Sequence, residues 1–490
     1  MIGTNGDDRM VGTTGVDELV GLLGDDRYFI FDADVPVIEA PGGGTDWITT
    51  TVSYTLDPGQ EIEVLRASAE LSIGLTLTGN ELDNWLVGAD GADTLIGGLG
   101  DDKLSGELGA DSMTGGGGND RYYIDNIADQ VIEATGGGID IAFTSVNFTL
   151  VAGQEIEYLR AYADAPGVML TGNELDNCLI GAGGNDEING GMGNDRLIGH
   201  AGNDTITTVG TSAQIDAGEG DDTIRLDGTA TSTGTVNGGI GDDTVTSTDL
   251  GEFVIRNVET LDTYYGFLTA SVRQVASFDA YTAVLAAADM QISMSLRGEG
   301  GTLDFTTGIS GQNSIEIRDG GLTSAIRITG SVNGDTMFGS LFDDAFSGGN
   351  GADVLLSGDG RDWLSGGAGN DRLNGGDGSD RLTGGIGDDT FVFDAPIGGG
   401  TNIDRIYDFT SAADTIEINQ EFYFTGLSLG SLDPGQFAIG TATGAGPQIV
   451  YNQSNGALYY DSDGAGSTGG THFATLVGAP TLVASDILIV

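Results

Sequence analysis

Aspartate returns at every ninth residue through four stretches of this chain, a few residues after glycine. Written in rows of nine, these stretches carry glycine at places one and four, aspartate at place six and an apolar residue at place eight. The longest stretch, residues 330–392, keeps the pattern through seven rows, and chance does not hold a phase for 63 residues. Carboxylate oxygens are ligands of hard cations, so this spacing predicts a row of metal sites.

The predicted metal ligands are the place-six aspartates of four blocks of rows and of two detached rows. They are Asp8, Asp17, Asp26, Asp93, Asp102, Asp111, Asp120, Asp186, Asp195, Asp204, Asp222, Asp243, Asp335, Asp344, Asp353, Asp362, Asp371, Asp380 and Asp389. Asn84 and Asn177 hold place six in the first rows of their blocks, and since an amide is a weaker ligand we expect these rows to be caps. Asn333 and Phe342 replace glycine at place four, which weakens the prediction for the first sites of the last block. The alternative, that an aspartate only hydrogen-bonds its own turn, stays open mainly for the two detached rows.

A single row cannot fold alone, so the rows must be positioned by stacking. Glycine permits tight backbone turns, and the last three residues of a row, such as 372–374, are long enough only for a very short strand. Stacked coils bury the middle side chain of each strand, such as Leu373, in a thin core. Stacking also brings the aspartates into register, which is repulsive without a counter-ion. Ca²⁺ resolves the repulsion because it takes about 6–8 oxygens from carboxylates and from carbonyls of the glycine turns.

These rows match the pattern GGxGxDxUx, so the chain resembles the RTX (repeats-in-toxin, haemolysin-type) calcium-binding proteins. The resemblance implies an all-β fold, a parallel β-roll or calcium-binding β-solenoid, in which two rows make one coil. It also implies that each Ca²⁺ lies between the turns of rows n and n+2. Blocks of three, five, four and seven rows would then hold about 11 ions.

The segments between the first blocks are copies of each other. Residues 24–78 and 118–171 align with an offset of 94 until a one-residue gap, and their middles alternate apolar and polar residues. Alternation is typical of a half-buried strand, so we expect β-helix-like inserts that continue the solenoid. The paired acids Glu61 and Glu63, with Glu155 and Glu157 in the copy, are expected on exposed strand faces and not as a general acid–base pair.

The pattern divides the chain into eight predicted segments. These are roll blocks at 1–29, 79–123, 172–246 and 330–392, inserts at 30–78 and 124–171, an irregular β-helix-like section at 247–329 and a C-terminal β cap at 393–490. The irregular section lacks the regular aspartate and is the expected place for a partner surface.

The last segment differs in composition from the rows. It resembles the C-terminal region that follows RTX repeats in serralysin-type proteases, and its end, SDILIV, is similar to type I secretion signals. The resemblance implies export by type I (ABC) secretion machinery and an extracellular location. The alternative is a terminal strand that caps the solenoid, and the two are compatible.

The charge and residue composition exclude several classes of partner and of structure. The 74 acidic and 17 basic residues give a formal charge of −57, which argues against nucleic acid and against anionic membrane surfaces. Cys178 is the only cysteine, so no intramolecular disulfide forms. The start MIGTNGDDRM does not have the form of a signal peptide, and no apolar run approaches the roughly 18 residues of a transmembrane segment.

The sequence predicts no enzyme and no catalytic residue. His200 and His472 are the only histidines and neither lies in HExxH, so the protease motif of the serralysins is absent. GLSLG (426–430) matches GxSxG formally but lies in the tail and not in an α/β-hydrolase array.

We therefore expect a secreted protein that folds when it binds extracellular Ca²⁺. Its expected role is that of a structural, surface or matrix component, with cell-surface polysaccharide or further copies of itself as partners. A secreted effector of the toxin or nodulation type is the alternative, and a hydrolase that uses residues 247–329 is a weaker one.

Overall fold

The computed structural model describes residues 1–490 except 14–17, 70, 134, 228–231, 259, 265–266, 272–273, 275–279, 285–290, 307–313, 398–401, 421–423 and 467–468. The chain forms two compact units, residues 1–244 with 252–257 and residues 245–251 with 258–490. Both are parallel β-solenoids, which confirms the expected all-β class; some sheets become mixed near the C-terminus. None of the helices in these ranges is long and apolar enough to cross a membrane.

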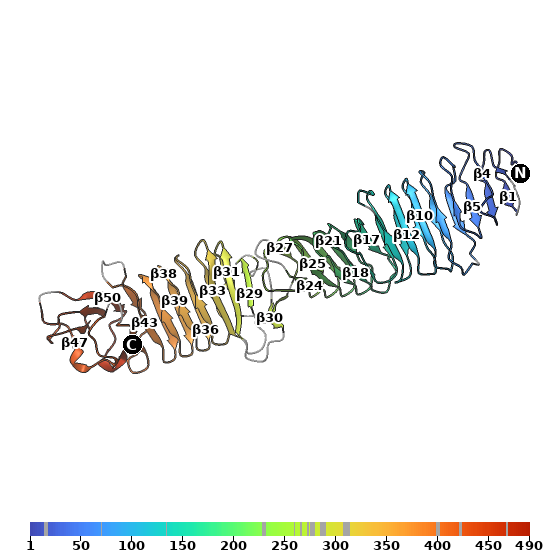
Figure 1. The fold of residues 1–490 in the computed structure, drawn as a ribbon. Coiled ribbons are helices and arrows are strands. Elements are labelled where there is room, and N and C mark those ends of the chain that lie inside the picture. Colours follow the sequence, from blue (N-terminus) through green and yellow to red (C-terminus); the bar gives the residue numbers. More distant parts are fainter. Residues whose placement is uncertain are drawn as a thin grey trace. The chain divides into compact units, whose positions relative to one another are not determined.

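The first unit is built on one 14-stranded sheet whose strands follow one another at every second step along the chain (Figure 1). The strands are β1 (Arg9–Gly12), β3 (Arg27–Ile30), β5 (Trp47–Thr50), β7 (Val64–Ala67), β9 (Trp85–Val87), β11 (Lys103–Ser105), β13 (Arg121–Ile124), β15 (Ile141–Thr144), β17 (Tyr158–Ala161), β19 (Cys178–Ile180), β21 (Asn194–Ala201), β23 (Ser212–Glu219), β25 (Thr233–Ile240) and β27 (Glu252–Arg256).

Intervening strands form the other sheets of this unit. They are β2 (Leu19–Val20) with β4 (Val37–Ile38); β6 (Tyr54–Thr55), β8 (Thr76–Thr78), β10 (Thr94–Leu99), β12 (Ser112–Gly117) and β14 (Gln130–Ile132); and β16 (Phe148–Thr149), β18 (Met169–Thr171), β20 (Glu187–Asn189), β22 (Thr205–Thr208) and β24 (Thr223–Leu226). The next strand, β26 (Thr244–Ser247), begins at the last residue of 1–244.

The second unit has two ten-stranded sheets. One contains β29 (Phe267–Ser271), β31 (Gln291–Gly298), β33 (Ser314–Leu322), β35 (Thr336–Phe338), β37 (Val354–Leu356), β40 (Arg372–Asn374), β43 (Thr390–Phe393), β45 (Thr415–Ile418), β51 (Ile487–Ile489) and β46 (Gly430–Ser431). The other contains β32 (Thr302–Asp304), β34 (Arg327–Thr329), β36 (Ala345–Asn350), β39 (Trp363–Ala368), β42 (Arg381–Ile386), β44 (Asp404–Ile406), β50 (Thr471–Leu476), β49 (Ala457–Asp461), β48 (Gln448–Asn452) and β47 (Phe437–Ile439). Short elements complete it: β28 (Thr260–Tyr264), β30 (Ala280–Val284), β38 (Asp359–Gly360), β41 (Asp377–Gly378) and the 3-10 helices η1 (Pro434–Gln436) and η2 (Ala484–Asp486).

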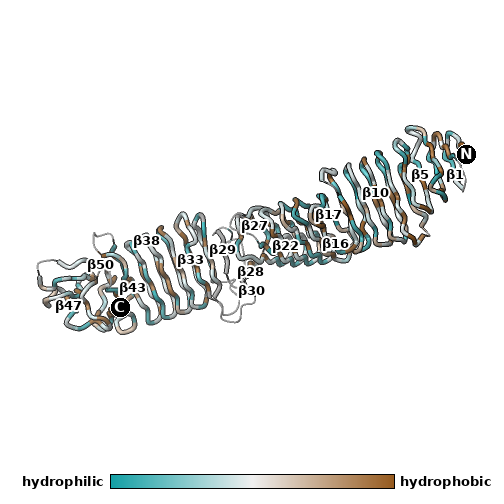
Figure 2. The backbone as a smooth tube through the Cα atoms, viewed as in Figure 1, coloured by the Kyte–Doolittle hydropathy of each residue, from teal (hydrophilic) through white to brown (hydrophobic). Residues whose placement is uncertain are grey.

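The core is the thin apolar column expected from the rows. In one sheet Leu355 lies opposite Leu373, which lies opposite Phe391. In the other sheet Leu364 lies opposite Leu382. All five side chains are fully buried. Hydrophobic and hydrophilic residues accordingly alternate along the coils (Figure 2).

The inserts continue the solenoid as expected. In the first copy Ile48 of β5 pairs with Tyr28 on one side and Leu65 of β7 on the other. In the second copy Ala142 of β15 takes the same place between Tyr122 and its neighbour in β17. The inserts therefore supply coils of different length to the same sheet.

The tail closes the second unit with the last strand of the chain. Strand β51 pairs in parallel with β45 and antiparallel with β46, and Ile487 and Ile489 are buried. Phe424 and Phe473 pack edge to face with ring centroids 5.1 Å apart, and Phe393 packs against Phe473 at 5.3 Å. This aromatic cluster gives the tail a core of its own and lets it cover the apolar end of the roll.

Candidate metal centres

The place-six aspartates are joined by a ladder of hydrogen bonds along the stacked coils. The main-chain N–H of Asp353 donates to Oδ1 of Asp371 at 2.8 Å, and that of Asp371 donates to Oδ1 of Asp389 at 2.9 Å. The same bond joins Asp362 to Asp380 at 2.8 Å on the other side of the coil. One carboxylate oxygen of each aspartate therefore holds the coil before it.

The structure places the predicted ligands as follows. Asp17 lies outside the described residues, Asp8 is half-buried and the other predicted aspartates are buried. The detached rows belong to a ladder, since Asp204 donates its N–H to Asp222 at 2.7 Å and Asp222 donates to Asp243 at 2.9 Å. Asp222 lies 18 residues after Asp204, one ordinary coil, and Asp243 lies 21 residues after Asp222, one longer coil, so the ladder is not interrupted.

The second oxygen of many of these carboxylates is buried and has no hydrogen-bond partner. This holds for Oδ2 of Asp26, Asp102, Asp111, Asp120, Asp195, Asp204, Asp222, Asp353, Asp362, Asp371 and Asp380. An ionised oxygen in such a place costs several kcal/mol unless a cation or a proton accompanies it. Each of these oxygens therefore needs a cation or a proton beside it.

At most of these sites a place-one glycine forms the wall, whereas Ala217 and Ser357 hold that place before Asp222 and Asp362. A Cβ built on Gly366 would collide with Oδ2 of Asp371 in its own row and with the carbonyl oxygen of Gly384 one coil on. The carboxylate and the carbonyl thus face one point beside the glycine, which only a residue without a Cβ leaves open. Oxygens from carboxylates and main-chain carbonyls are the donor set that Ca²⁺ prefers, so the residues present fit Ca²⁺.

The backbone at place two decides whether Oδ2 is open. In several rows place two is not glycine and its N–H closes the turn onto the carboxylate, as from Ala89 to Asp93 at 2.7 Å and from Ser340 to Asp344 at 2.7 Å. In rows with an open oxygen, place two has a left-handed backbone, as at Gly349 with φ 109°. The closed rows found in this way are the first two rows of the blocks at 79–123, 172–246 and 330–392.

Three side-chain-bearing residues adopt this left-handed conformation at place two. They are Leu22 with φ 93°, Glu107 with φ 60° and His200 with φ 81°. The conformation costs about 1–2 kcal/mol in a residue with a Cβ. This strain recurs at the place where the backbone leaves the carboxylate open. The left-handed conformation of these residues is therefore imposed by the open site and not by the conformational preference of the residues themselves.

Burial raises the pKa of the ladder carboxyls. The pKa of Asp102 rises to about 8 because of burial and because Asp120 adds a like charge. Burial, with the charge of Asp371, raises the pKa of Asp353 to about 7. In the deeply buried pair of Asp380 and Asp404, burial and the neighbouring charge raise the pKa of Asp380. Protons and cations therefore compete for these oxygens.

The ladder also contains residues that the nine-residue pattern misses. Asp26 donates its N–H to Asp46 at 2.8 Å, Asp120 donates to Asp140 at 2.8 Å and Asp389 donates to Asp414 at 3.1 Å. They lie 20 or 25 residues on from their partners, so a search at a step of nine or eighteen passes over them. The one available signal was an aspartate immediately before each expected strand.

Two predictions about the inserts are wrong. Asn84 and Asn177 are not caps, because the amide of Asn84 donates to the carbonyl of Ile62 at 2.8 Å, a bond that a carboxylate cannot make, and Asn177 does the same in the copy. Glu63 and Glu157 are half-buried and not fully exposed. Each accepts a main-chain N–H at 2.7 Å, so both are rungs of the ladder.

Comparison with known proteins agrees with this geometry. The model of the RTX calcium-binding nonapeptide repeat (4 copies) matches residues 2–29, 78–113, 87–122, 171–206, 329–364 and 356–391. No curated protein matches the chain.

Solved structures with local similarity include two modules of the mannuronan C5-epimerase of Azotobacter vinelandii. The AlgE6R3 subunit is 30% identical over 32% of this chain and 78% of its own, with a TM-score of 0.19. The AlgE6R2 subunit is 29% identical over 33% of this chain and 92% of its own, with a TM-score of 0.17. The matched ranges contain all the predicted place-six aspartates except Asp222 and Asp243. The chain carries RTX calcium-binding nonapeptide repeats that form a β-solenoid.

Proposed function

We propose that this is a secreted, non-enzymatic protein whose folding is coupled to extracellular Ca²⁺ and which serves as a structural component of a cell surface or matrix. The observation that carries the proposal is the set of buried carboxylate oxygens without a hydrogen-bond partner, such as Oδ2 of Asp371, which faces the carbonyl oxygen of Gly384 across Gly366.

The chemistry that Ca²⁺ supplies is charge neutralisation and oxygen coordination between coils. The residues of the chain do the rest. Asp371 holds the preceding coil with Oδ1, Gly366 keeps the space beside Oδ2 open and the left-handed backbone at Gly367 keeps the turn from closing onto the carboxylate. With a net charge of −57, the chain without cations repels itself, so binding free energy becomes folding free energy.

Export by the type I route fits this coupling. Cytosolic Ca²⁺ is scarce, so the chain stays expanded until it reaches the outside, where sites of this kind bind at roughly 10⁻⁴–10⁻³ M. The terminal strand β51 is paired and buried in the folded state, so a transporter would have to read it before folding.

Circular dichroism with and without millimolar Ca²⁺ tests the coupling. We expect a β spectrum in Ca²⁺ and its loss in chelator. A β spectrum of equal strength in chelator would contradict the proposal.

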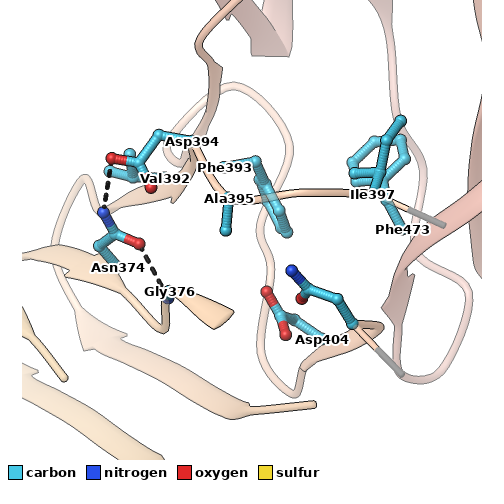
Figure 3. A pocket seen from close by; sticks show the side chains of 10 residues that line it. Asn374, Gly376, Val392, Phe393, Asp394, Ala395, Ile397, Asp404 and Phe473 are labelled. Atoms are coloured by element: carbon cyan, nitrogen blue, oxygen red, sulfur yellow. Dashed lines mark hydrogen bonds between the residues drawn. The ribbon is translucent and has the colours of Figure 1, made fainter. Parts of the chain in front are cut away.

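One hollow in the described part of the chain offers no room for an active site. A hollow where the roll meets the tail, lined by Asn374, Asp394, Asp404 and Phe473 among others, has a volume of about 10 Å³, room for about one water molecule (Figure 3). Asn374 closes one side with hydrogen bonds of 3.0 Å to Asp394 and from the N–H of Gly376. The space is too small for a substrate.

An open groove on the second unit favours an anionic partner. It has a volume of about 620 Å³, and Arg361, Arg381, Arg405 and His472 line it with only Asp343 opposing them. Arg381 and Arg405 are neighbours on paired strands, and all three arginines are exposed. In a strongly acidic protein such a groove attracts a polyanion, and for a surface component we assign this partner as an acidic polysaccharide.

Binding to a soluble acidic polysaccharide in Ca²⁺ tests the partner. Replacement of the three arginines by Gln should weaken binding at least tenfold and reduce its salt dependence, whereas R9Q/R27Q/R121Q, which removes equal charge elsewhere, should not. Equal affinity of both triple variants would contradict the assignment. On the producing cell, the structural role predicts retention in Ca²⁺ and release by chelator, while lytic or signalling activity in the medium would favour an effector.

A further inference from the structure

At the end of the first two roll blocks, the last aspartate of the nine-residue pattern meets two acidic side chains that lie outside the pattern. Asp26, Glu39 and Asp46 each offer an oxygen, and these oxygens lie within 4.8 Å of one another; Asp120, Glu133 and Asp140 do the same in the copy. We propose that these are two further cation sites, one at each junction between a roll block and an insert, which bind Ca²⁺ through three carboxylates and a tyrosine hydroxyl.

The tyrosine belongs to the strand that precedes each insert. Tyr28 of β3 is fully buried, and its hydroxyl donates to Oε1 of Glu39. Tyr122 of β13 is fully buried and donates to Oε1 of Glu133. Each tyrosine therefore has its ring in the hydrophobic column and its hydroxyl in the acidic cluster. The hydroxyl oxygen can also bind a cation there.

Three oxygens converge on one point in each cluster. A Cβ built on Gly21 would meet, as its three nearest atoms, the hydroxyl of Tyr28, Oε1 of Glu39 and Oδ2 of Asp26. A Cβ built on Gly115 would meet the corresponding atoms of Tyr122, Glu133 and Asp120. In the repeats, a main-chain carbonyl oxygen of the next coil lies where the tyrosine and glutamate oxygens lie here. An example is the carbonyl oxygen of Gly384 beside Gly366.

A second observation is that aspartate oxygens in both clusters are buried and have no hydrogen-bond partner. Asp26 is 0% exposed and Asp120 is 1% exposed, and Oδ2 of both has no hydrogen-bond partner although it is aimed at the shared point. Oδ2 of Asp140, which is 0% exposed, is without a partner as well. Three carboxylates without a compensating cation repel one another strongly in a buried place.

The cluster is present in both copies. Asp, Tyr, Glu and the second Asp recur at an offset of 94. In each copy the first Asp, the Tyr and the Glu surround the equivalent glycine, and the second Asp belongs to the same acidic cluster.

The donor set distinguishes these sites from the repeat sites. Glu39 replaces a neutral carbonyl with a charged carboxylate, which raises the negative charge around the cation. For Ca²⁺ sites, affinity rises with ligand charge. The insert sites should therefore fill at a lower Ca²⁺ concentration than the repeat sites.

Calcium binding by the full-length chain, measured by equilibrium dialysis, tests this inference. E39Q/E133Q should bind two fewer Ca²⁺ at low free calcium, or bind two of them about 10- to 100-fold more weakly. E81Q/E174Q is the matched control, because it makes the same substitution at equivalent exposed positions that follow the two copies. It should leave stoichiometry and affinity unchanged.

The tyrosines give a second readout that does not depend on a change of charge. Tb³⁺ substituted for Ca²⁺ should show luminescence excited through Tyr28 and Tyr122, and Y28F/Y122F, which keeps the buried rings, should lose that part of the emission. If E39Q/E133Q binds like the control and Y28F/Y122F leaves the emission unchanged, the clusters are held by protons and the inference is overturned. Failure of the repeats to bind Ca²⁺ would lower binding in all variants equally, so the two failures are distinguishable.

Discussion

The roll at 330–392 and the insert at 30–78 reach the same ladder by different routes. In the roll each coil takes 18 residues, and the N–H of Asp353 meets Asp371 at 2.8 Å. In the insert the steps are 20 residues from Asp26 to Asp46 and 17 residues from Asp46 to Glu63, yet the distances are 2.8 and 2.7 Å. The fold therefore requires an acceptor immediately before each strand, and the nine-residue row is one way to supply it.

The largest expected effect is a difference between the two regions in the free Ca²⁺ concentration that each needs to stay folded. As free Ca²⁺ is lowered stepwise, protease cleavage within 330–392 should appear before cleavage within 24–78, because the insert site adds a third carboxylate to its cation. Mass spectrometry of the fragments would give the order. Cleavage of the insert first would show that its longer coils weaken it more than the extra carboxylate stabilises it.

Removing two rungs of the roll should have the next largest effect. D371A/D380A leaves the N–H groups of Asp353 and Asp362 without an acceptor and deletes two cation ligands, so the free energy of unfolding should fall by about 2–6 kcal/mol and the Ca²⁺ midpoint should rise. Calcium titration followed by circular dichroism would measure both.

The control for this pair lies in the same coils. D359A/D377A removes two exposed carboxylates, which should leave the midpoint nearly unchanged. An equal shift in both variants would mean that net charge, and not the ladder, governs folding.

Acid should partly replace Ca²⁺ in both regions. Burial raises the pKa of Asp102 to about 8, of Asp353 to about 7 and, in the insert, of Asp46 to about 7, whereas the unfolded value is about 3.9. The folded chain without metal thus binds more protons, so its stability is fully present below about pH 4 and is lost as the pH rises through 7 to 8. In chelator, the β signal should be stronger at pH 5 than at pH 8. A signal independent of pH would mean that the carboxyls titrate alike in both states.

The smallest effect concerns the backbone that opens each site. His200→Gly should stabilise the Ca²⁺-bound chain by about 1 kcal/mol because it relieves a left-handed residue with a Cβ. Ala89→Gly, at place two of a closed row, should destabilise it by about 0.5–1 kcal/mol. Thermal melts in saturating Ca²⁺ would compare them, and changes of the same sign would contradict the division into open and closed rows.

The fold was predictable wherever one row repeats the next. Leu373 and Leu382 lie in the column that their place-eight positions predicted, because a step of nine residues fixes both the turn and the side of the coil. The inserts were predictable as strands, since alternation survives a change of coil length. Their contribution to the ladder was not, because Asp46 and Glu63 depend on how much chain the preceding turn consumes.

The sequence predicted which aspartates line the candidate sites, but not whether Oδ2 of each one is open or hydrogen-bonded. Asp93 and Asp102 occupy equivalent places in the pattern, yet Oδ2 of Asp93 accepts an N–H at 2.7 Å and Oδ2 of Asp102 is open. The difference lies in the φ angle of the residue at place two. Glycine at that place signals the open state, whereas Leu22, Glu107 and His200 adopt it without any such signal in the sequence.

The register of the two copies also shows how a chain of this kind can be lengthened by duplication of a segment. Each insert begins after an aspartate that precedes one strand of the 14-stranded sheet, adds strands to that sheet, and ends before Asn84 or Asn177, which precedes the next strand. Duplication of the segment therefore adds whole coils, and no residue downstream changes its side of the solenoid. Gene-level repetition can lengthen this molecule without a compensating mutation, which makes its length a freely evolving trait.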